Sequence, residues 1–411
     1  MNLAHKVHHE HNLINEGVVS GLTIYEAHDQ LGGTWLVNTY PGVACAVPAH
    51  IYTFPFEPNP DWSAFYASGG EICRYFERTV KKYGLDRDLK LGHRVQKAEF
   101  DEEAGKWMLE IGTKDGANFK DECDILVSAV GFLSDWRWPG IPGLHDFEGS
   151  LMHSAVWDAS FDPTGKKIAV IGNGSSGIQI LPKIVEKAQH VTNFIRKPTY
   201  ITPGLGSGMI DGKEQHIYTE DEKRNFRENP EELKNYRKKI QGDSNRAFDM
   251  FVKDSHAQES ARKATQDSMK AKLGANSELA EKLTPAYEVG CRRATPGPGY
   301  LEAFKRDDCS LMTEPIQRVE AQGIRTTDGT LHEFDAVVCA TGFNVSHRPK
   351  WPLIGKGGKS LAEEWVDEPR SYLSLCAPGF PNFFSKSIAA SSINHRGISA
   401  NIPINYSVLR P

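Results

Sequence analysis

The stretch KKIAVIGNGSSGIQILPKIVEKAQHVTNFIRKP, residues 166–198, has the order of a strand, a glycine-rich turn, a helix and a second strand. Its glycines are spaced as Gly172-x-Gly174-x-x-Gly177. In this pattern the first glycine permits a tight turn, the second lets a pyrophosphate approach the backbone, and the third lets helix and strand pack closely. The backbone N–H groups at the start of the helix, from Ser175 onward, favour a phosphate. The sequence therefore predicts a Rossmann-type unit that binds a dinucleotide.

The end of the second predicted strand indicates which dinucleotide would bind. An NAD site usually offers an acidic residue there, which binds the ribose hydroxyls. This chain instead has Arg196 and Lys197, whose positive charges can pair with a 2′-phosphate. We therefore predict that the unit binds NADPH, and the alternative is a Rossmann unit that binds nothing.

The composition is that of a globular protein without an unusual partner. The chain has 411 residues, 39% of them hydrophobic, and a formal net charge of -5. This charge gives no reason to expect nucleic acid or an anionic membrane surface as a partner. No apolar run approaches the roughly 20 residues of a membrane helix, and the first residues are too polar for a secretory signal. We expect a cytoplasmic protein without a membrane span, whose oligomeric state stays open.

The cysteines and histidines favour neither disulfides nor a metal site. The seven cysteines are odd in number and far apart, and several lie in apolar runs, so we predict buried thiols in a reducing compartment. Residues 1–21 are predicted to form a polar helix that carries four histidines. No cysteine or second acidic cluster accompanies these histidines, which favours a solvated helix face over a metal site. They are His5, His8, His9 and His11.

A short strand and a loop near the start of the chain predict a second ligand site. Residues 22–26, LTIYE, have the pattern of a strand that ends in Glu26, an acid able to accept ribose hydroxyls. The loop that follows suits a segment closing over a flat ligand. Such loops normally come after a strand, a glycine-rich turn and a helix, and that turn is missing before residue 22. The loop residues are Gly32, Gly33, Thr34 and Trp35.

Two apolar runs on either side of the glycine-rich unit predict further strands. Residues 123–132, CDILVSAVGF, are almost continuously apolar, which is typical of a strand buried on both faces of a parallel sheet. Residues 335–343, DAVVCATGF, repeat this pattern and also end in a small-residue turn. We interpret the glycine-rich unit as a domain inserted into another domain, whose sheet is completed after the insertion.

The predicted fold is therefore α/β, with two Rossmann-like dinucleotide-binding domains, the first of them truncated, and a helical insertion. We expect a helix from residue 69 to about residue 85 and two hairpins, with turns at 103–105 and at 328–329. The first domain comprises 1–150 and 326–411, the second 151–209 and 286–325, and the charged helical insertion 210–285.

One further motif makes the chain recognisable. The segment FEGSLMHSAVWD fits the fingerprint F-x-G-x-x-x-H-x-x-x-W-[PD] through Phe147, Gly149, His153, Trp157 and Asp158. On this motif, the GGTW…YPG loop and the segment CRRATPGPGYLEAF, the chain resembles Baeyer–Villiger, or class B flavin-containing, monooxygenases, particularly fungal ones. The resemblance implies an FAD domain with an inserted NADPH domain, acting on a small hydrophobic molecule of secondary metabolism.

The resemblance also assigns roles to individual residues. It implies that Glu26 holds the FAD ribose and that the loop at 32–35 lines the flavin. It places Arg293 where the family keeps the arginine that stabilises a negative peroxyflavin, as a fixed cation does beside a developing anion. The alternative is that Arg292 and Arg293 form surface ion pairs. His153 is expected to be structural rather than a base.

The chain departs from the family pattern on the FAD side. The N-terminal strand and its glycine-rich turn are missing, Cys45-Ala46 stands where the family has Cys-Asp, and 388–390 replace a Gly-Pro-Asn turn. A truncated gene model would explain the missing ends but not the interior changes. We therefore expect doubtful FAD binding and favour an enzyme repurposed for a redox-neutral cyclisation, rearrangement or isomerisation.

In the repurposed enzyme, three side chains would provide electrostatic or acid–base help in the vacated pocket, namely Arg293, Arg292 and His395. Two alternatives stay open. The first is a conventional monooxygenase dependent on NADPH and FAD. The second is a catalytically dead binding partner of another enzyme, because a pocket alone does not establish turnover.

Overall fold

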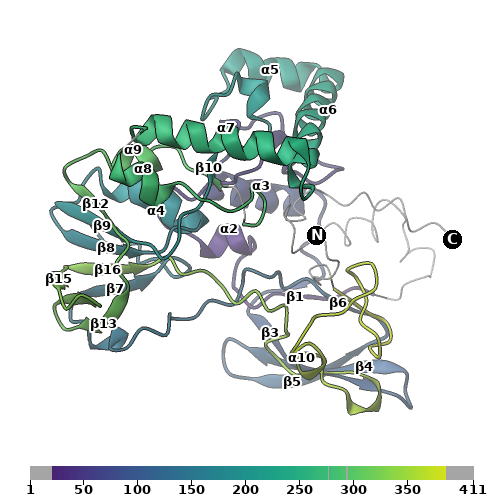
Figure 1. The fold of residues 1–411 in the computed structure, drawn as a ribbon. Helices are drawn as coiled ribbons and strands as arrows, with labels where there is room; N and C mark the ends of the chain where they lie inside the picture. The colour runs from purple at the N-terminus through teal and green to yellow at the C-terminus, as the bar shows by residue number, and fades with distance from the viewer. Residues whose placement is uncertain (1–20, 276, 293–294, 386–411) are drawn as a thin grey trace. The chain divides into compact units, whose positions relative to one another are not determined.

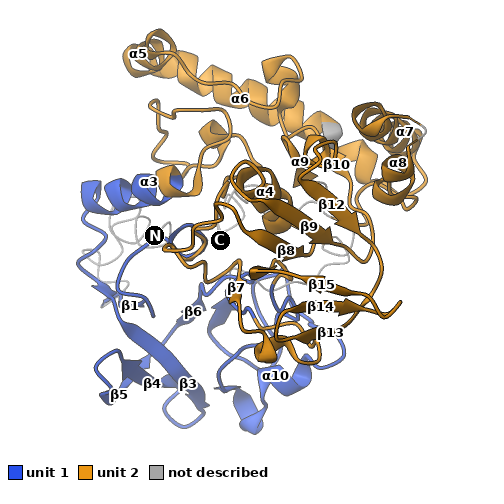
Figure 2. Ribbon diagram, turned by 90° about the vertical axis from the view of Figure 1, so that its left-hand side faces the viewer, with its two compact units in different colours: residues 1–36, 72–136, 343–395 blue, residues 37–71, 137–342, 396–411 orange. Residues whose placement is uncertain are grey.

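The computed structural model describes residues 21–275, 277–292 and 295–385, and the chain divides into two compact units (Figures 1 and 2). Unit 1 comprises residues 1–36, 72–136 and 343–395, and unit 2 comprises residues 37–71, 137–342 and 396–411. The helix predicted for residues 1–21 lies, except for its last residue, outside the described residues. Within the described residues, no helix is long and apolar enough to cross a membrane.

A parallel sheet of five strands forms the centre of unit 2. Its strand order is β12-β9-β8-β16-β7, and all four pairings are parallel. The predicted strand, turn, helix and strand are confirmed as β8, helix α4 (Ser175–Ile184) and β9. The strands are β7 (Ser150–His153), β8 (Lys167–Ile171), β9 (His190–Phe194), β12 (Cys309–Met312) and β16 (Ala336–Cys339).

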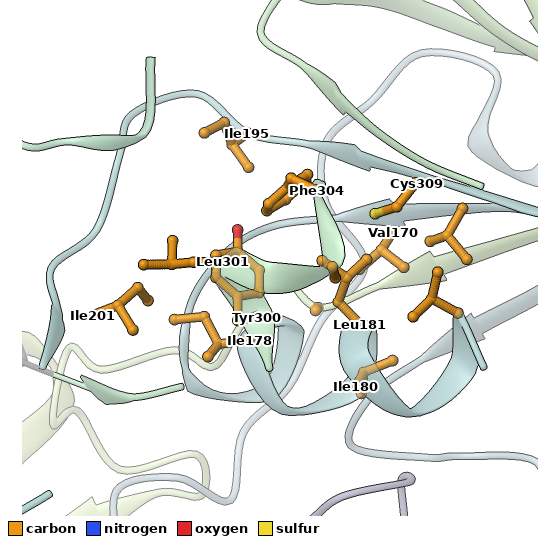
Figure 3. Close-up of a cluster of buried hydrophobic side chains, with 14 of the residues drawn as sticks. Val170, Ile178, Ile180, Leu181, Ile195, Ile201, Tyr300, Leu301, Phe304 and Cys309 are labelled. Atoms are coloured by element: carbon orange, nitrogen blue, oxygen red, sulfur yellow. The ribbon is translucent and has the colours of Figure 1, made fainter. Parts of the chain in front are cut away.

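The two faces of this sheet carry separate apolar clusters, because successive side chains of a strand point to opposite faces. Ile168 and Val170 of β8 join one cluster, together with side chains of α4 and α9 (Tyr300–Ala303) (Figure 3). Ala169 and Ile171 join the other, which includes residues of the antiparallel strands β13 (Ile316–Glu320) and β14 (Gly323–Thr326). Strand β15 (Leu331–Glu333) pairs with β14, so the hairpin predicted around 328–329 is confirmed.

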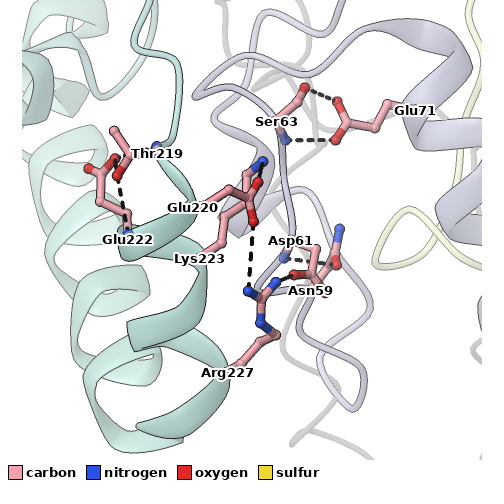
Figure 4. A network of polar contacts seen from close by, with 9 residues as sticks. All are labelled: Asn59, Asp61, Ser63, Glu71, Thr219, Glu220, Glu222, Lys223 and Arg227. Atoms are coloured by element: carbon pink, nitrogen blue, oxygen red, sulfur yellow. Dashed lines mark hydrogen bonds and ion pairs between the residues drawn. The ribbon is translucent and has the colours of Figure 1, made fainter.

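The segment predicted as a helical insertion is helical. Helix α5 begins with a capping box in which Thr219 and Glu222 satisfy each other's backbone N–H groups. Arg227 of α5 forms an ion pair with Asp61, which joins this helix to the 59–63 segment of unit 2 (Figure 4). The helices are α5 (Glu220–Glu228), α6 (Pro230–Arg246), α7 (His256–Leu273) and α8 (Glu278–Leu283).

Unit 1 is built on a sheet of four strands in the order β17-β3-β4-β5. The predicted hairpin is confirmed, because Asp101 of β3 pairs with Lys106 of β4 around its turn. Helix α3 (Gly69–Lys82) also forms as predicted, and its Val80 packs against Ile24. The strands of unit 1 are β1 (Ile24–Tyr25), β2 (Leu89–Lys90), β3 (His93–Asp101), β4 (Lys106–Thr113), β5 (Asn118–Cys123), β6 (Leu126–Ser128), β17 (Leu353–Ile354) and β18 (Phe383–Ser385).

The prediction of a fully buried strand at residues 123–132 is wrong. Strand β5 ends at Cys123, and the three-residue strand β6 follows; within the described part of the chain β6 pairs with β18 alone. One face of β6 packs into the core of unit 1 through Leu126, but the opposite face reaches solvent. The exposed fractions are 57% for Ile125, 41% for Val127 and 60% for Val130.

The assignment of residues 335–343 to the first domain is also wrong for the strand that forms there, β16 (Ala336–Cys339). Strand β16 pairs with β7 on one edge and with β8 on the other, inside the sheet of unit 2. All four residues of β16 are buried and apolar. Such a strand is buried on both faces when it lies at the centre of a parallel sheet that is covered on both sides. The chain returns to unit 1 at Phe343 rather than near residue 326.

The segment 37–71, which the sequence placed in the first domain, belongs to unit 2 because it is bonded to α4. The Tyr40 hydroxyl donates to Gln179 Oε1 at 2.8 Å, and Gln179 Nε2 donates to the Ala44 carbonyl at 3.0 Å. Gly42 lies so close that a Cβ there would be 2.5 Å from the Gln179 carbonyl oxygen. The Tyr-Pro-Gly corner is therefore packed on the helix of the glycine-rich turn.

All seven cysteines are free thiols. Cys45, Cys309 and Cys339 are buried, as predicted, and burial raises the pKa of Cys309 and Cys339 to about 12. Cys291 is exposed, so the prediction of buried thiols is wrong for this residue.

A buried histidine of unit 2 lies among aromatic rings. His50 is 1% exposed, and its ring lies 5.0 Å from that of Tyr218, 5.1 Å from Phe226 and 5.5 Å from Tyr236. Neither ring nitrogen has a hydrogen-bond partner within the described residues. Burial lowers the pKa of His50 to about 3, so the imidazole is neutral in the folded protein.

This burial makes the stability of unit 2 sensitive to acid. The folded pKa of about 3 lies below the ordinary value of 6.5, so the unfolded state alone takes up a proton between these limits. We expect His50→Phe to be more stable than the wild type at pH 5 by about 2 kcal/mol, and by less at pH 8. Urea unfolding at both pH values measures this, with the exposed His256→Gln as control. An equal difference at the two pH values would contradict it.

Candidate nucleotide-binding site

The glycine-rich turn joins the end of β8 to the start of α4 at a point of close packing. Gly172 has φ +113°, a conformation that favours glycine, and a Cβ there would lie 2.5 Å from the Ala340 carbonyl oxygen. A Cβ on Gly177 would lie 2.3 Å from the Gly172 carbonyl oxygen. The first and third glycines are therefore required by packing, as their spacing predicts.

The second glycine faces open space. A Cβ on Gly174 would have nothing within 4 Å, although Gly174 is the N-cap residue of α4. The cap makes no side-chain hydrogen bond, and the first turn of α4 has no acidic residue. A helix of this length concentrates unsatisfied N–H groups and positive partial charge at its start. This end of α4 can therefore receive a phosphate group.

The basic pair lies at the same edge of the sheet as the turn. Ile171, the last residue of β8, pairs with Phe194, the last residue of the parallel strand β9. Arg196 and Lys197 lie two and three residues after the end of β9 and are both exposed. The carboxyl ends of neighbouring parallel strands meet at one edge, which is where nucleotides bind in open α/β sheets.

The structure adds a residue that the sequence analysis missed. The side chain of Asn173 donates from Nδ2 to the Lys197 carbonyl at 2.9 Å, so it joins the turn to the basic segment. Its position between two glycines gave no indication of this contact. Ser175, the first residue of α4, lies with its Oγ 3.4 Å from Thr295 Oγ1, a buried hydroxyl of β11 (Thr295–Pro296).

The residues assigned to the FAD side lie at the other unit. Glu26 follows β1 and accepts a hydrogen bond from the His28 backbone N–H at 2.9 Å. Gly32 has φ +141° and would place a Cβ 2.7 Å from Cys73 Sγ. Gly33, at φ +52°, and Thr34 are exposed, and Trp35 is half-buried in the short helix α2 (Thr34–Val37).

These residues fit an FAD only in part. An acid after a strand and a permissive glycine pair suit a ribose and a flat ring. A pyrophosphate is usually held at the start of a helix that follows a strand through a glycine-rich turn, and the helix that follows β1 and the glycine pair, α2, has only four residues. The described residues of unit 1 therefore suit the ribose and the ring of an FAD, and their role in binding it stays a prediction.

His153 has the contacts of a structural residue. It is fully buried, its Nδ1 accepts from the Ala155 backbone N–H at 3.1 Å, and its Nε2 lies 3.3 Å from Thr341 Oγ1. Burial lowers the pKa of His153, so the ring is neutral near pH 7. These contacts support the structural role expected from the sequence.

Of the three predicted catalytic side chains, only Arg292 lies among the described residues. Arg292 is exposed, and its guanidinium lies 5.5 Å from the centre of the Tyr287 ring. Arg293 and His395 lie outside the described residues. A catalytic role for these residues stays a prediction. Within the described chain, no cluster of histidine, cysteine or acidic side chains could hold a metal ion.

The fold and the turn define an α/β protein with a dinucleotide-binding site. A family model described as "Flavin-binding monooxygenase-like" matches residues 18–206. The FAD-binding monooxygenase tazF of Aspergillus terreus is 41% identical over 404 residues, which cover 98% of this chain and 71% of that protein. The FAD-binding monooxygenase stcW of Emericella nidulans is 34% identical, with coverages of 88% and 61%. The chain belongs to the flavin-binding monooxygenase family.

Solved structures of Baeyer–Villiger monooxygenases have the same architecture. Cyclohexanone monooxygenase from Rhodococcus sp. Phi1, bound to NADP⁺, matches 93% of this chain and 76% of its own, with a TM-score of 0.77 and 27% identity. An oxidised steroid monooxygenase bound to NADP matches 88% and 75%, with a TM-score of 0.74 and 30% identity. These matches confirm the predicted class with two dinucleotide-binding domains.

The packing around the turn predicts opposite effects at two glycines. Gly177→Ala should lower the free energy of unfolding by about 1 to 3 kcal/mol, because its methyl group meets a backbone oxygen that side-chain movement cannot relieve. Gly174→Ser should leave stability unchanged or raise it by a few tenths, because serine is a good N-cap residue. Thermal and urea unfolding of both variants measure the difference. A Gly177→Ala protein as stable as Gly174→Ser would contradict the packing argument.

Proposed function

We propose that this chain is an NADP(H)-binding enzyme of Baeyer–Villiger monooxygenase type that acts on a small hydrophobic molecule. The single observation that supports nucleotide binding most directly is the turn at 172–177. Its first and third glycines are required by packing, and its second leaves the start of α4 open. Gly172, Gly174, Ser175 and Gly177 would hold the pyrophosphate.

The basic pair supports NADP(H) over NAD(H). Arg196 and Lys197 are exposed at the edge where the ribose of a dinucleotide lies in Rossmann folds, and no acidic residue stands there. Asn173 holds the Lys197 backbone, so the pair is attached to the phosphate turn. The structural relatives described as bound to NADP⁺ are consistent with this proposal.

For the reaction, we propose a redox-neutral cyclisation, rearrangement or isomerisation. In the family, bound FAD supplies the oxidising chemistry, and the described residues of unit 1 fit only part of that group. Ala46 also lacks the carboxylate that the family pattern places there beside an arginine. It follows Cys45, which is buried and donates its backbone N–H to the Ala67 carbonyl at 3.0 Å.

Two other functions compete with this proposal. A conventional monooxygenase dependent on NADPH and FAD is supported by the names of tazF and stcW, which are FAD-binding monooxygenases. A catalytically dead binding partner would keep the fold and the pocket without turnover. The cytoplasmic location and the assignment of unit 1 as FAD-type and unit 2 as NADPH-type stay predictions.

The absorption spectrum of the purified protein distinguishes the redox-neutral enzyme from the monooxygenase. For a redox-neutral enzyme we expect no stoichiometric flavin bands and no consumption of NADPH, even after FAD is added, because its reaction would not use the flavin. The control is a structurally related cyclohexanone monooxygenase prepared in the same way. Flavin at near-stoichiometric occupancy together with NADPH consumption would show a monooxygenase instead.

The basic pair predicts the nucleotide preference. Arg196→Ala should weaken NADP⁺ binding by about 1 to 3 kcal/mol, the range for a charge-assisted hydrogen bond, and should affect NAD⁺ much less. Isothermal titration calorimetry with both nucleotides measures this. Lys187→Ala, an exposed cation of unit 2 before the start of β9, is the matched control and should bind both as the wild type does. Equal affinity of the wild type for NAD⁺ and NADP⁺ would contradict the assignment.

A further inference from the structure

We propose that two buried side chains behind the turn, Asn193 and Tyr300, position it for the nucleotide. The inference rests on the proposed NADP(H) binding, which it deepens. Neither residue belongs to the glycine motif or to the basic pair. Both act through the backbone of Gly172 and are therefore positioning residues rather than catalytic ones.

The contacts of Asn193 use both ends of its amide. Asn193 lies in β9 and is fully buried. Its Nδ2 donates to the Gly172 carbonyl at 3.1 Å and to the Val170 carbonyl at 2.9 Å. Its Oδ1 accepts from the Tyr300 hydroxyl at 2.8 Å. The three groups form a relay from α9 through β9 to the turn.

The relay lies in an otherwise apolar environment. Tyr300 is 1% exposed and lies among the side chains of Ile178, Leu301 and their neighbours (Figure 3). Burial raises the pKa of Tyr300, so its hydroxyl stays protonated and can only donate toward the Asn193 oxygen in this geometry. A buried amide is costly unless its groups are paired, and a fully paired network rigidifies the groups it joins.

The hydrogen bond to Gly172 sets the direction of a peptide plane. In a trans peptide the C=O and the following N–H point in opposite directions, and no cis peptide bond occurs among the described residues. Because the Gly172 carbonyl points to Asn193, the N–H of Asn173 points away from that side chain. The amide of Asn193 therefore determines which way the first N–H of the turn faces.

Gly172 is held on its other sides as well. Its N–H donates to the Phe194 carbonyl at 2.9 Å, and its carbonyl oxygen lies against the bare Cα of Gly177 in the first turn of α4. Rotation of the Gly172 carbonyl would therefore disturb the start of the helix together with the turn. The start of a helix binds a phosphate through oriented N–H groups. Loss of this orientation should therefore weaken nucleotide binding.

Three variants separate positioning from stability. Tyr300→Phe and Asn193→Leu each leave a buried polar group without its partner, so both should be destabilised. The double variant Asn193→Leu/Tyr300→Phe leaves neither side chain unpaired, and only the Val170 and Gly172 carbonyls lose a donor, so it should be more stable than Asn193→Leu alone. Tyr66→Phe is the matched control, because Tyr66 is a buried tyrosine of unit 2 whose hydroxyl donates to the Leu205 carbonyl at 2.9 Å.

Two measurements on the full chain test the inference. Amide hydrogen exchange without nucleotide reports the order of the turn at residues 172–176, and calorimetry reports the dissociation constant of NADP⁺. For the double variant we expect a melting temperature above that of Asn193→Leu alone, faster exchange at the turn than in the wild type, and NADP⁺ binding weakened on the order of fivefold to tenfold. Tyr66→Phe should change neither the exchange at the turn nor the affinity.

Each outcome has a definite meaning. Unchanged exchange at the turn in the folded double variant would overturn the inference. Faster exchange with unchanged NADP⁺ affinity would overturn it too, because the relay would then have no consequence for binding. A wild-type protein that does not bind NADP⁺ would contradict the proposed function, whereas the exchange comparison would still decide whether the pair holds the turn.

Discussion

The close approach of helix α4 to the end of strand β8 is the contact on which unit 2 depends. The Gly172 carbonyl lies against Gly177, and both glycines pack on Ala340, which follows β16. A side chain at either glycine would push the helix away from the sheet. Because neither glycine has a side chain between the turn and the helix, the start of α4 lies directly above the carboxyl ends of two parallel strands. Its N–H groups converge on one point there.

The rest of the unit supports this contact from both faces of the sheet. Strands β8 and β16 are apolar on both sides, and each contributes alternate residues to two separate clusters. This double burial keeps the sheet edge in place beneath the turn. Asn193 and Tyr300 are the polar pair within one of these clusters, and their fully paired groups link the apolar core to the backbone of the site.

The segment 37–71 belongs to unit 2, although its position in the sequence suggests that it belongs with residues 1–36 in unit 1. The Tyr-Pro-Gly corner is separated from the GGTW loop by four residues, but Tyr40 and Ala44 are bonded to Gln179 of α4. Movement of α4 would therefore be transmitted to this corner. The corner that follows the 32–35 loop in the sequence is thus attached to the helix of the glycine-rich turn.

The sequence by itself determined the local elements of the site. Glycine spacing favours a tight turn, and apolar runs of strand length favour burial, so β8, α4 and β9 could be predicted from residues 166–198. The position of the basic pair at 196–197 was also predictable, because these residues come next in the chain after the second predicted strand. Each of these inferences depends on neighbours in sequence, and the hairpins of both units were predictable for the same reason.

Only the tertiary structure decided which strands share a sheet and which side chains meet. The runs at 123–132 and 335–343 have the same pattern, yet β16 lies at the centre of a sheet whereas β6 has an exposed face. An apolar pattern indicates that a strand can be buried. It does not indicate which neighbouring element buries it. Asn193 and Tyr300 are 107 positions apart in the chain. Their contact arises from the packing of α9 against α4 and the sheet, which no local pattern encodes.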